Sequence, residues 1–162
     1  MNPNIENSGI PSKEQIERTL PSKERREKGP YVVIECWQKI PCNPCVKACP
    51  FGVIQPMEDI NDLPVTDIDK CTGCGLCISL CPGLAIFVID ETYGEEDQAL
   101  VMIPHEFVPI PKKGDLVQAL DRQGNYICDA QVVRTTQNKS NTTVVHLLIP
   151  REFILDVRAI KP

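Results

Sequence analysis

The sequence has few aromatic residues and no long apolar run. Aromatic side chains make up 5% of the 162 residues, and the longest apolar stretch, Leu84 to Ile89, is far too short to cross a bilayer. The N-terminal residues MNPNIENSGIPSKEQ lack the basic start, apolar middle and cleavage site of a signal peptide. Glycine-rich phosphate loops, dinucleotide fingerprints and paired-carboxylate signatures are also missing. We therefore expect a cytoplasmic protein that has no catalytic residues and no substrate site of its own.

Basic residues are scarce in the middle of the chain. Residues 31–103 contain 3 basic and 11 acidic side chains, so the net charge of −5 comes wholly from this segment. Negative charge repels nucleic acid and anionic membrane surfaces, and it can steer a basic redox partner. A charged surface that only keeps a small domain in solution is the alternative interpretation. Under either interpretation, we expect the protein to bind no nucleic acid and no membrane.

Cysteine, in contrast, is abundant, and eight of the nine cysteines lie within residues 36–82. The second run reads Cys71, Cys74, Cys77, Cys81 and Pro82. This C-x₂-C-x₂-C-x₃-C-P spacing is typical of cubane iron–sulfur sites. The first run reads Cys36, Cys42, Cys45, Cys49 and Pro50. Its last three cysteines keep the same spacing, whereas an x₅ gap separates the first cysteine from the second.

The two runs are copies of one another. One constant shift along the chain places Cys42, Cys45, Cys49, Pro50 and Ile54 on Cys74, Cys77, Cys81, Pro82 and Ile86. Only Cys36 breaks the register, because the residue that matches Cys71 is Lys39. β-Branched stretches before each run and apolar stretches after it predict a strand, a cysteine loop, a short helix and a strand in each half.

Prolines and glycines are expected to shape these loops around a cofactor. Pro50 and Pro82 turn the chain away after each run and cannot donate a backbone N–H. Gly73 and Gly75 allow backbone amides to approach the sulfur atoms closely. We therefore count these four residues with the cofactor-binding residues.

Two other uses of cysteine fit the sequence less well. Zinc sites also use paired cysteines, but four thiols in one C-x₂-C-x₂-C-x₃-C run are too dense for the usual two separated knuckles. Disulfides are not expected in a reducing cytoplasm. Cys128 stands among predicted strand residues without a neighbouring cysteine, and we interpret it as a small buried apolar residue.

Residues 31–90 resemble the bacterial-type two-cluster ferredoxins in spacing, trailing proline and internal repeat. The resemblance implies an α+β ferredoxin-like fold with a pseudo-two-fold repeat, two [4Fe–4S] clusters and one-electron transfer. In this family the fourth ligand of each cluster comes from the other run, so the resemblance also implies which four cysteines bind each cluster. The first cluster would bind Cys36, Cys42, Cys45 and Cys81, and the second Cys71, Cys74, Cys77 and Cys49. The x₅ gap leaves a three-iron or labile first cluster open.

The flanking segments differ in character from this domain. In the arm of residues 1–30, Ser12 and Gln15 form a capping-box pattern that predicts a helix over 13–20, and 23–28 is expected to be exposed. We interpret residues 91–103 as a connector. Residues 104–162 form a predicted β module, a small antiparallel barrel or sandwich. Its expected strands are 115–120, 126–134, 142–149 and 154–160.

The most favoured function is an electron-transfer subunit of a larger oxidoreductase. The stretch GPYVVIECWQKIPCNPC is similar to small iron–sulfur subunits of FAD-dependent amino-acid or amine dehydrogenases, of the proline, hydroxyproline and sarcosine type, in anaerobic bacteria. That similarity implies an FAD-containing partner in a hetero-oligomer. A free-standing ferredoxin-type carrier is one alternative. A cluster-bearing regulator or RNA-binding protein is another, and it would require a basic face with exposed aromatics.

Overall fold

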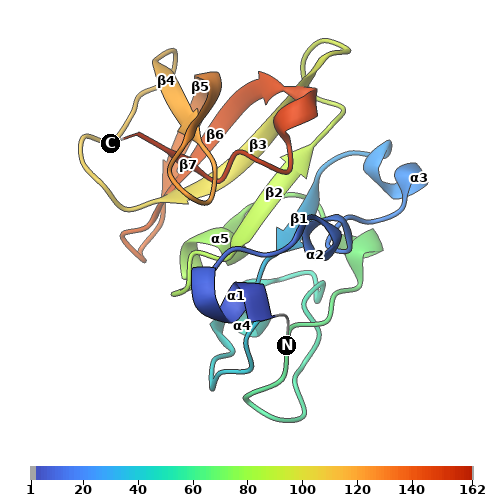
Figure 1. The fold of residues 1–162 in the computed structure, drawn as a ribbon. Helices are drawn as coiled ribbons and strands as arrows, with labels where there is room; N and C mark the ends of the chain where they lie inside the picture. The colour runs from blue at the N-terminus through green and yellow to red at the C-terminus, as the bar shows by residue number, and fades with distance from the viewer. Residues whose placement is uncertain (1–2, 162) are drawn as a thin grey trace.

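One antiparallel sheet of seven strands runs through residues 3–161, the part of the chain that the computed structural model describes (Figure 1). The strands are β1 (Tyr31–Ile34), β2 (Ile86–Asp90), β3 (Gln98–His105), β4 (Leu116–Leu120), β5 (Tyr126–Gln137), β6 (Thr143–Pro150) and β7 (Ala159–Ile160). Their spatial order is β1-β2-β3-β6-β5-β4-β7. The helices are α1 (Pro3–Ser8), α2 (Lys13–Glu17), α3 (Lys23–Arg26), α4 (Pro44–Ala48) and α5 (Leu76–Leu80), with 3₁₀ turns η1 (Ile68–Lys70) and η2 (Arg151–Phe153). The predicted α+β class is confirmed.

The cysteine-rich half is held by one strand pair and one isolated bridge, so the strands expected after the first run and before the second are reduced to that bridge. β1, which precedes the first cysteine run, pairs with β2, which follows the second. Ile54, after the first run, bridges Thr66, before the second. The helices α4 and α5 are equally short and begin at equivalent places in the two runs, Pro44 and Leu76. The chain therefore brings the end of each run close to the start of the other.

Two apolar clusters cover the two faces of β1, β2 and β3. Phe87 and Ile89 pack with the C-terminal strands, whereas Ile86 and Val88 pack with α4 and α5. Successive side chains of a strand point to opposite faces, so a strand that is covered on both sides is apolar throughout. The run IFVI in β2 meets this requirement. The second cluster supports the cysteine loops from beneath.

The structure corrects the interpretation of residues 91–103 as a connector. β3 (Gln98–His105) lies at the centre of the sheet and pairs with β2 on one side and β6 on the other. Both of its faces are buried, so its sequence does not alternate, and the acidic turn before it hid the strand signal. The sheet therefore continues without interruption from the cysteine-rich half to the C-terminal strands.

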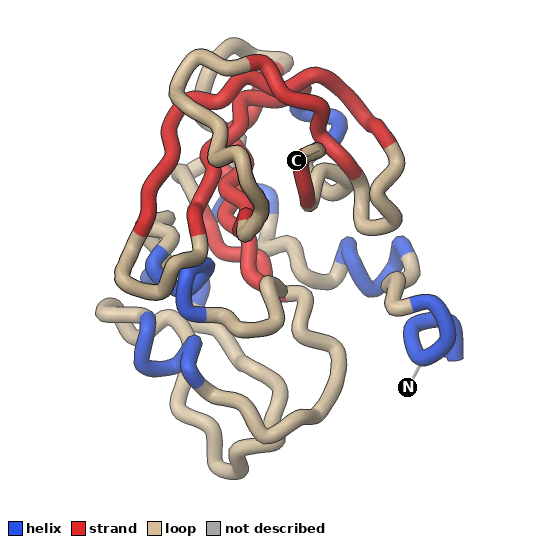
Figure 2. Tube along the Cα trace, turned by 90° about the vertical axis from the view of Figure 1, so that its left-hand side faces the viewer, coloured by secondary structure: helices blue, strands red, loops and turns tan. Residues whose placement is uncertain are grey.

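The C-terminal strands agree with three of the four expected ranges. β4, β5 and β6 lie where strands were expected, but of residues 154–160 only Ala159 and Ile160 form a strand. The strands curve strongly around the first apolar cluster (Figure 2). β1 and β7 remain the two edges of one sheet, so neither the barrel nor the sandwich expected for residues 104–162 is confirmed.

The N-terminal arm, residues 1–30, packs against the rest of the protein in its described part. The Ser12–Gln15 capping box is present, with the Ser12 hydroxyl accepting from the backbone N–H of Gln15, and α2 begins at Lys13 as predicted but ends at Glu17, short of residue 20. The expectation that 23–28 is exposed is wrong for Arg25, which is 7% exposed. No helix within residues 3–161 has the length and apolar character needed to cross a bilayer.

Candidate metal centre

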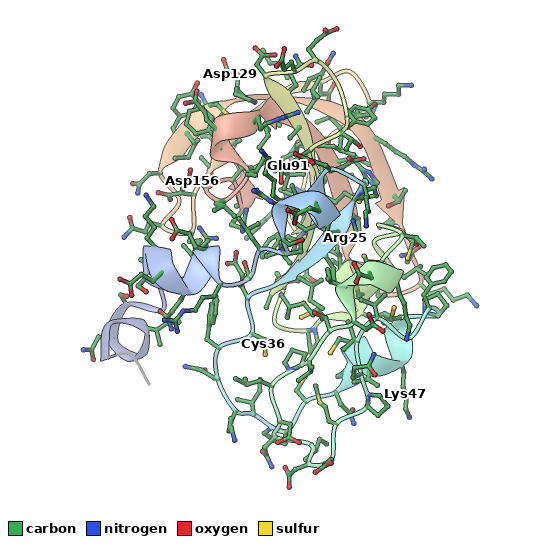
Figure 3. The ribbon with its side chains drawn as sticks, turned by 90° about the vertical axis from the view of Figure 1, so that its right-hand side faces the viewer. Arg25, Cys36, Lys47, Glu91, Asp129 and Asp156 are labelled. Atoms are coloured by element: carbon green, nitrogen blue, oxygen red, sulfur yellow. The ribbon has the colours of Figure 1, made fainter. Side chains whose placement is uncertain are left out.

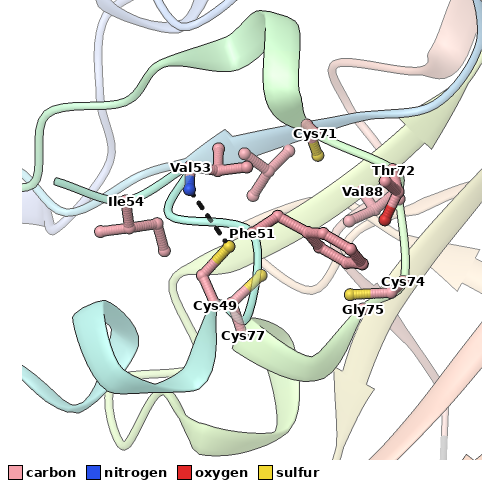
Figure 4. Close-up of a pocket in the computed structure, with 12 residues that line it drawn as sticks. Cys49, Phe51, Val53, Ile54, Cys71, Thr72, Cys74, Gly75, Cys77 and Val88 are labelled. Carbon is pink, nitrogen blue, oxygen red and sulfur yellow. Dashed lines mark hydrogen bonds between the residues drawn. The ribbon is translucent and has the colours of Figure 1, made fainter.

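Four thiols from both cysteine runs line one pocket (Figure 4). They are Cys49, Cys71, Cys74 and Cys77, called here the Cys71 group. Cys49 ends α4, Cys77 lies on α5, and the other two come from the loop between η1 and α5. Apolar side chains, including Phe51 and Val88, form the remaining walls. Cys74 is exposed, so this group lies close to the protein surface.

The other four cysteines of the two runs also come together. Cys36, Cys42 and Cys81 line a wider pocket, and Cys45 is close enough to interact electrostatically with all three. These four thiols are called the Cys36 group. The x₅ gap thus does not remove Cys36 from its neighbours. Ile5 of α1 lines the same cavity, so the N-terminal arm covers this group.

The thiols are placed where a positively charged metal core would stabilise them. Burial raises the pKa of Cys77 to about 12, and the neighbouring thiols Cys71, Cys74 and Cys49 contribute to this increase. Burial and then Cys81 likewise raise the pKa of Cys45. Buried, mutually repelling thiolates need bound cations to ionise, and iron in a cluster supplies that charge. The donor set therefore fits a thiolate-bound cluster.

The spacing of the thiols distinguishes a site for a single metal ion from a site for a cubane cluster. Within residues 3–161, no three His, Cys, Asp or Glu side chains converge closely enough to hold a single metal ion. In a cubane cluster each of the four thiolates binds a different iron, so their sulfur atoms need not meet at one point. Each group brings four cysteines together, the number that a cubane requires.

Backbone amides approach the sulfur atoms at equivalent places in the two halves. The Val53 N–H donates to Cys49 Sγ at 3.4 Å, and the Ala85 N–H donates to Cys81 Sγ at 3.4 Å. The same shift that superposes the two cysteine runs also superposes these two contacts. Amide hydrogen bonds to sulfur favour the thiolate form and influence cluster potentials.

The turn before each of these amides requires a positive φ angle. Gly52 adopts a φ of 64° in the first half, but in the second half the equivalent residue is Leu84, with a φ of 50°. A left-handed conformation costs a residue with a Cβ roughly 1–2 kcal/mol. Leu84 therefore retains backbone strain beside a predicted cluster ligand.

This strain predicts that Leu84→Gly stabilises the protein. We expect the free energy of unfolding to rise by about 0.5–1 kcal/mol, because part of the relieved strain is offset by the greater freedom of glycine in the unfolded chain. Gly52→Ala is the reciprocal control, and we expect it to cost about 1 kcal/mol. Urea unfolding of the cluster-loaded protein measures both. A loss of stability in Leu84→Gly would contradict the assignment of strain.

The structure places Gly73 against the N-terminal arm. A Cβ on Gly73, whose φ is 70°, would lie 2.4 Å from the Cβ of Pro30. Its amide also acts on the Cys71 thiol and opposes the pKa increase caused by burial. Gly75, with a φ of 74°, precedes the first turn of α5. Pro82 lines the cavity of the Cys36 group, and Pro50 is exposed beyond Cys49.

Sequence reasoning missed a buried arginine beside the Cys71 group. Figure 3 labels this residue, Arg25. Its guanidinium donates to the carbonyl oxygens of Ile68 at 3.1 Å, Gly29 at 3.2 Å, and Pro30 and Cys71 both at 2.8 Å. The charged run KERREK gave no signal that one of its members is buried. Arg25 joins the N-terminal arm to the loop that carries Cys71.

A second buried charge network lies beside Cys36. Arg122 donates to both carboxylate oxygens of Glu35, at 2.8 and 2.6 Å, and Arg158 donates to it at 2.8 Å. Burial raises the pKa of Glu35, but the two arginines outweigh it and hold the pKa below its ordinary value. A glutamate at the end of the apolar run YVVIEC was a signal for this site. The network joins the C-terminal strands to the first cysteine loop.

Cys128 lies apart from both thiol groups. It is buried on β5 opposite Ala119 of β4, within the first apolar cluster. This position agrees with its interpretation as a small apolar residue.

The cysteine-rich half matches a known family. Residues 20–85 match the family model described as a 4Fe-4S dicluster domain. This part of the chain is therefore a 4Fe-4S ferredoxin-type domain. No solved structure matches the chain.

The relatives of this chain include subunits of reductases and a ferredoxin. The chain is 46% identical, over 64 residues, to one subunit of the selenate reductase of Mesobacillus selenatarsenatis, covering 39% of this chain and 21% of that protein. It is 43% identical over 47 residues to one subunit of the ion-translocating oxidoreductase complex of Methanosarcina acetivorans, covering 29% and 17%. An uncharacterized ferredoxin of Methanocaldococcus jannaschii is 37% identical over 65 residues, covering 40% and 37%. The chain thus spans well under half the length of these relatives.

Proposed function

We propose that this protein is an electron-transfer subunit that holds two [4Fe–4S] clusters within a larger oxidoreductase complex. The first cluster is held by Cys36, Cys42, Cys45 and Cys81, and the second by Cys71, Cys74, Cys77 and Cys49. The observation that carries the proposal is the pair of four-thiol groups, each drawn from both cysteine runs. The two sets also agree with a pseudo-two-fold repeat.

The clusters supply one-electron chemistry, and the polypeptide controls their surroundings. The second apolar cluster supports both cysteine loops and keeps water from their inner sides. The Val53 and Ala85 amides stabilise negative charge on two of the sulfur atoms. Prolines 50 and 82 and glycines 73 and 75 shape the loops. The substrate chemistry is assigned to other chains.

Iron and sulfide analysis tests the cofactor assignment directly. Protein purified without oxygen should contain about eight iron atoms and about eight acid-labile sulfides per chain. One-electron titration should reveal two reducible centres. About two zinc ions per chain and no labile sulfide would contradict the proposal, whereas about seven iron atoms would indicate a three-iron first cluster.

The partner is proposed to be an FAD-containing dehydrogenase subunit, as the resemblance of GPYVVIECWQKIPCNPC implies. Two of the relatives are subunits of complexes or reductases, which supports a partner in general terms. Gel filtration of material from the native host tests the assembly. We expect co-elution with a yellow flavoprotein that oxidises an amino acid or amine and reduces the clusters. Elution near the mass of the chain alone, 18.1 kDa, would instead favour the free-standing carrier.

A further inference from the structure

We propose that Arg25 of the N-terminal arm is a positioning residue for the second cluster, which locks the Cys71 loop and raises the reduction potential of that cluster. This inference rests on the proposed cofactor. It assigns the arm a role at the redox centre in addition to any role at the surface.

The hydrogen bonds of Arg25 converge on one end of the cysteine loop. Its side chain reaches the carbonyl groups of Ile68 and Cys71, which lie 43 and 46 residues further along the chain. These two carbonyls belong to the first residue of η1 and to the first cysteine of the second run. Because the donors form a rigid planar fork, one guanidinium fixes both carbonyls at once. The loop cannot move outward without breaking charged hydrogen bonds.

The end of the arm contacts the same loop through close packing. Pro30 occupies the space that a Cβ of Gly73 would need. The other two hydrogen bonds of Arg25 go to Gly29 and Pro30, so the guanidinium also holds the arm in this position. Gly29 has a φ of 129°, which allows the chain to turn there. Arg25 and Pro30 therefore hold the loop from two sides of Cys71.

The charge of Arg25 is poorly compensated by protein groups. Its nearest carboxylate, Asp69, is 3.9 Å away and its side chain is 80% exposed, so solvent screens this pair. Arg25 itself is buried, and its guanidinium lies 2.8 Å from the carbonyl oxygen of Cys71. Reduction adds one electron to the cluster, so a buried positive charge stabilises the reduced form more than the oxidised form. Cluster potentials depend on nearby charge and hydrogen bonding.

Two substitutions separate the charge from the hydrogen-bonding fork. In Arg25→Met we expect one of the two one-electron steps to move to a more negative potential, while the other keeps its value. We also expect iron release to a chelator to be about tenfold faster, because charged hydrogen bonds to the loop are lost. In Arg25→Lys we expect the reduction potential of the second cluster to stay close to the wild-type value, because the positive charge remains. Iron release should still be faster than in the wild type, because lysine cannot bridge the two carbonyls. Hydrogen exchange of residues 68–73 should increase in both variants.

Lys23→Gln is the matched control, because it removes one positive charge from the same helix, α3, at an exposed position. An equal shift of potential in Lys23→Gln, or unchanged potential and iron release in Arg25→Met, would overturn the inference. If Arg25→Met does not fold, iron release from Arg25→Lys decides, and a wild-type rate would count against it. Wild-type protein without two clusters would refute the proposed cofactor instead, and hydrogen exchange would still test the loop contact.

Discussion

Replacing Cys77 by alanine should remove about half of the iron and half of the labile sulfide from the anaerobically purified protein. Cys77 is buried on α5, and its thiol lies with Cys49, Cys71 and Cys74 around one cavity. The substitution takes away one of four thiolates, and the one cysteine outside the runs, Cys128, lies in the other apolar cluster and cannot replace it. Because bound metal contributes folding free energy, α5 should also become less stable.

Cys128→Ala provides the control for this experiment. It makes the same chemical change at a buried cysteine outside both thiol groups, so the iron content should stay at the wild-type value. Cys45→Ala should reproduce the half loss from the Cys36 group. Full iron in Cys77→Ala, or loss of a cluster in Cys128→Ala, would show that the ligand assignment is wrong.

Replacing Glu35 by alanine should reduce the free energy of unfolding by about 3–5 kcal/mol, because it leaves two arginines without their shared carboxylate in a buried site. The side chains of Arg122 and Arg158 are 13% and 3% exposed, so water cannot take the place of Glu35 at Arg158. Cys36 follows Glu35 directly in the chain. We therefore also expect the first cluster to be lost faster than the second.

Denaturant unfolding and the rate of iron release to a chelator measure the two effects. The control is a triple variant in which Glu35, Arg122 and Arg158 are all changed to methionine, so that all three charges are removed together. It should recover much of the lost stability, since apolar residues can replace a complete buried ion network. An unchanged unfolding midpoint in Glu35→Ala would show that the network contributes nothing.

The features that the sequence predicted correctly depend on local spacing. The capping box at Ser12 needs residues only three positions apart, and the strands of the C-terminal part follow from short β-branched runs. The grouping of cysteines followed from a resemblance whose motif is equally local. The structure brings both sets of four together, and their role as ligands stays a prediction.

The features that the sequence did not predict depend on long-range contacts. Arg25 meets Cys71 across a sequence separation of 46, and Glu35 meets Arg158 across one of 123. No local pattern distinguishes a buried arginine from its exposed neighbours in a charged run. β3 was missed because a strand covered on both faces loses the alternation that identifies half-buried strands. Burial by distant segments is the common cause.

The position of β3 has a consequence for attempts to isolate the cluster-binding part. A chain that stops at residue 90 would end with β2, whose outer backbone groups normally bond to β3. Such a fragment would expose an unprotected apolar strand edge, which is a template for intermolecular pairing. The cluster-binding half thus needs the C-terminal part of the chain to cover this edge, even if those strands never touch a redox partner.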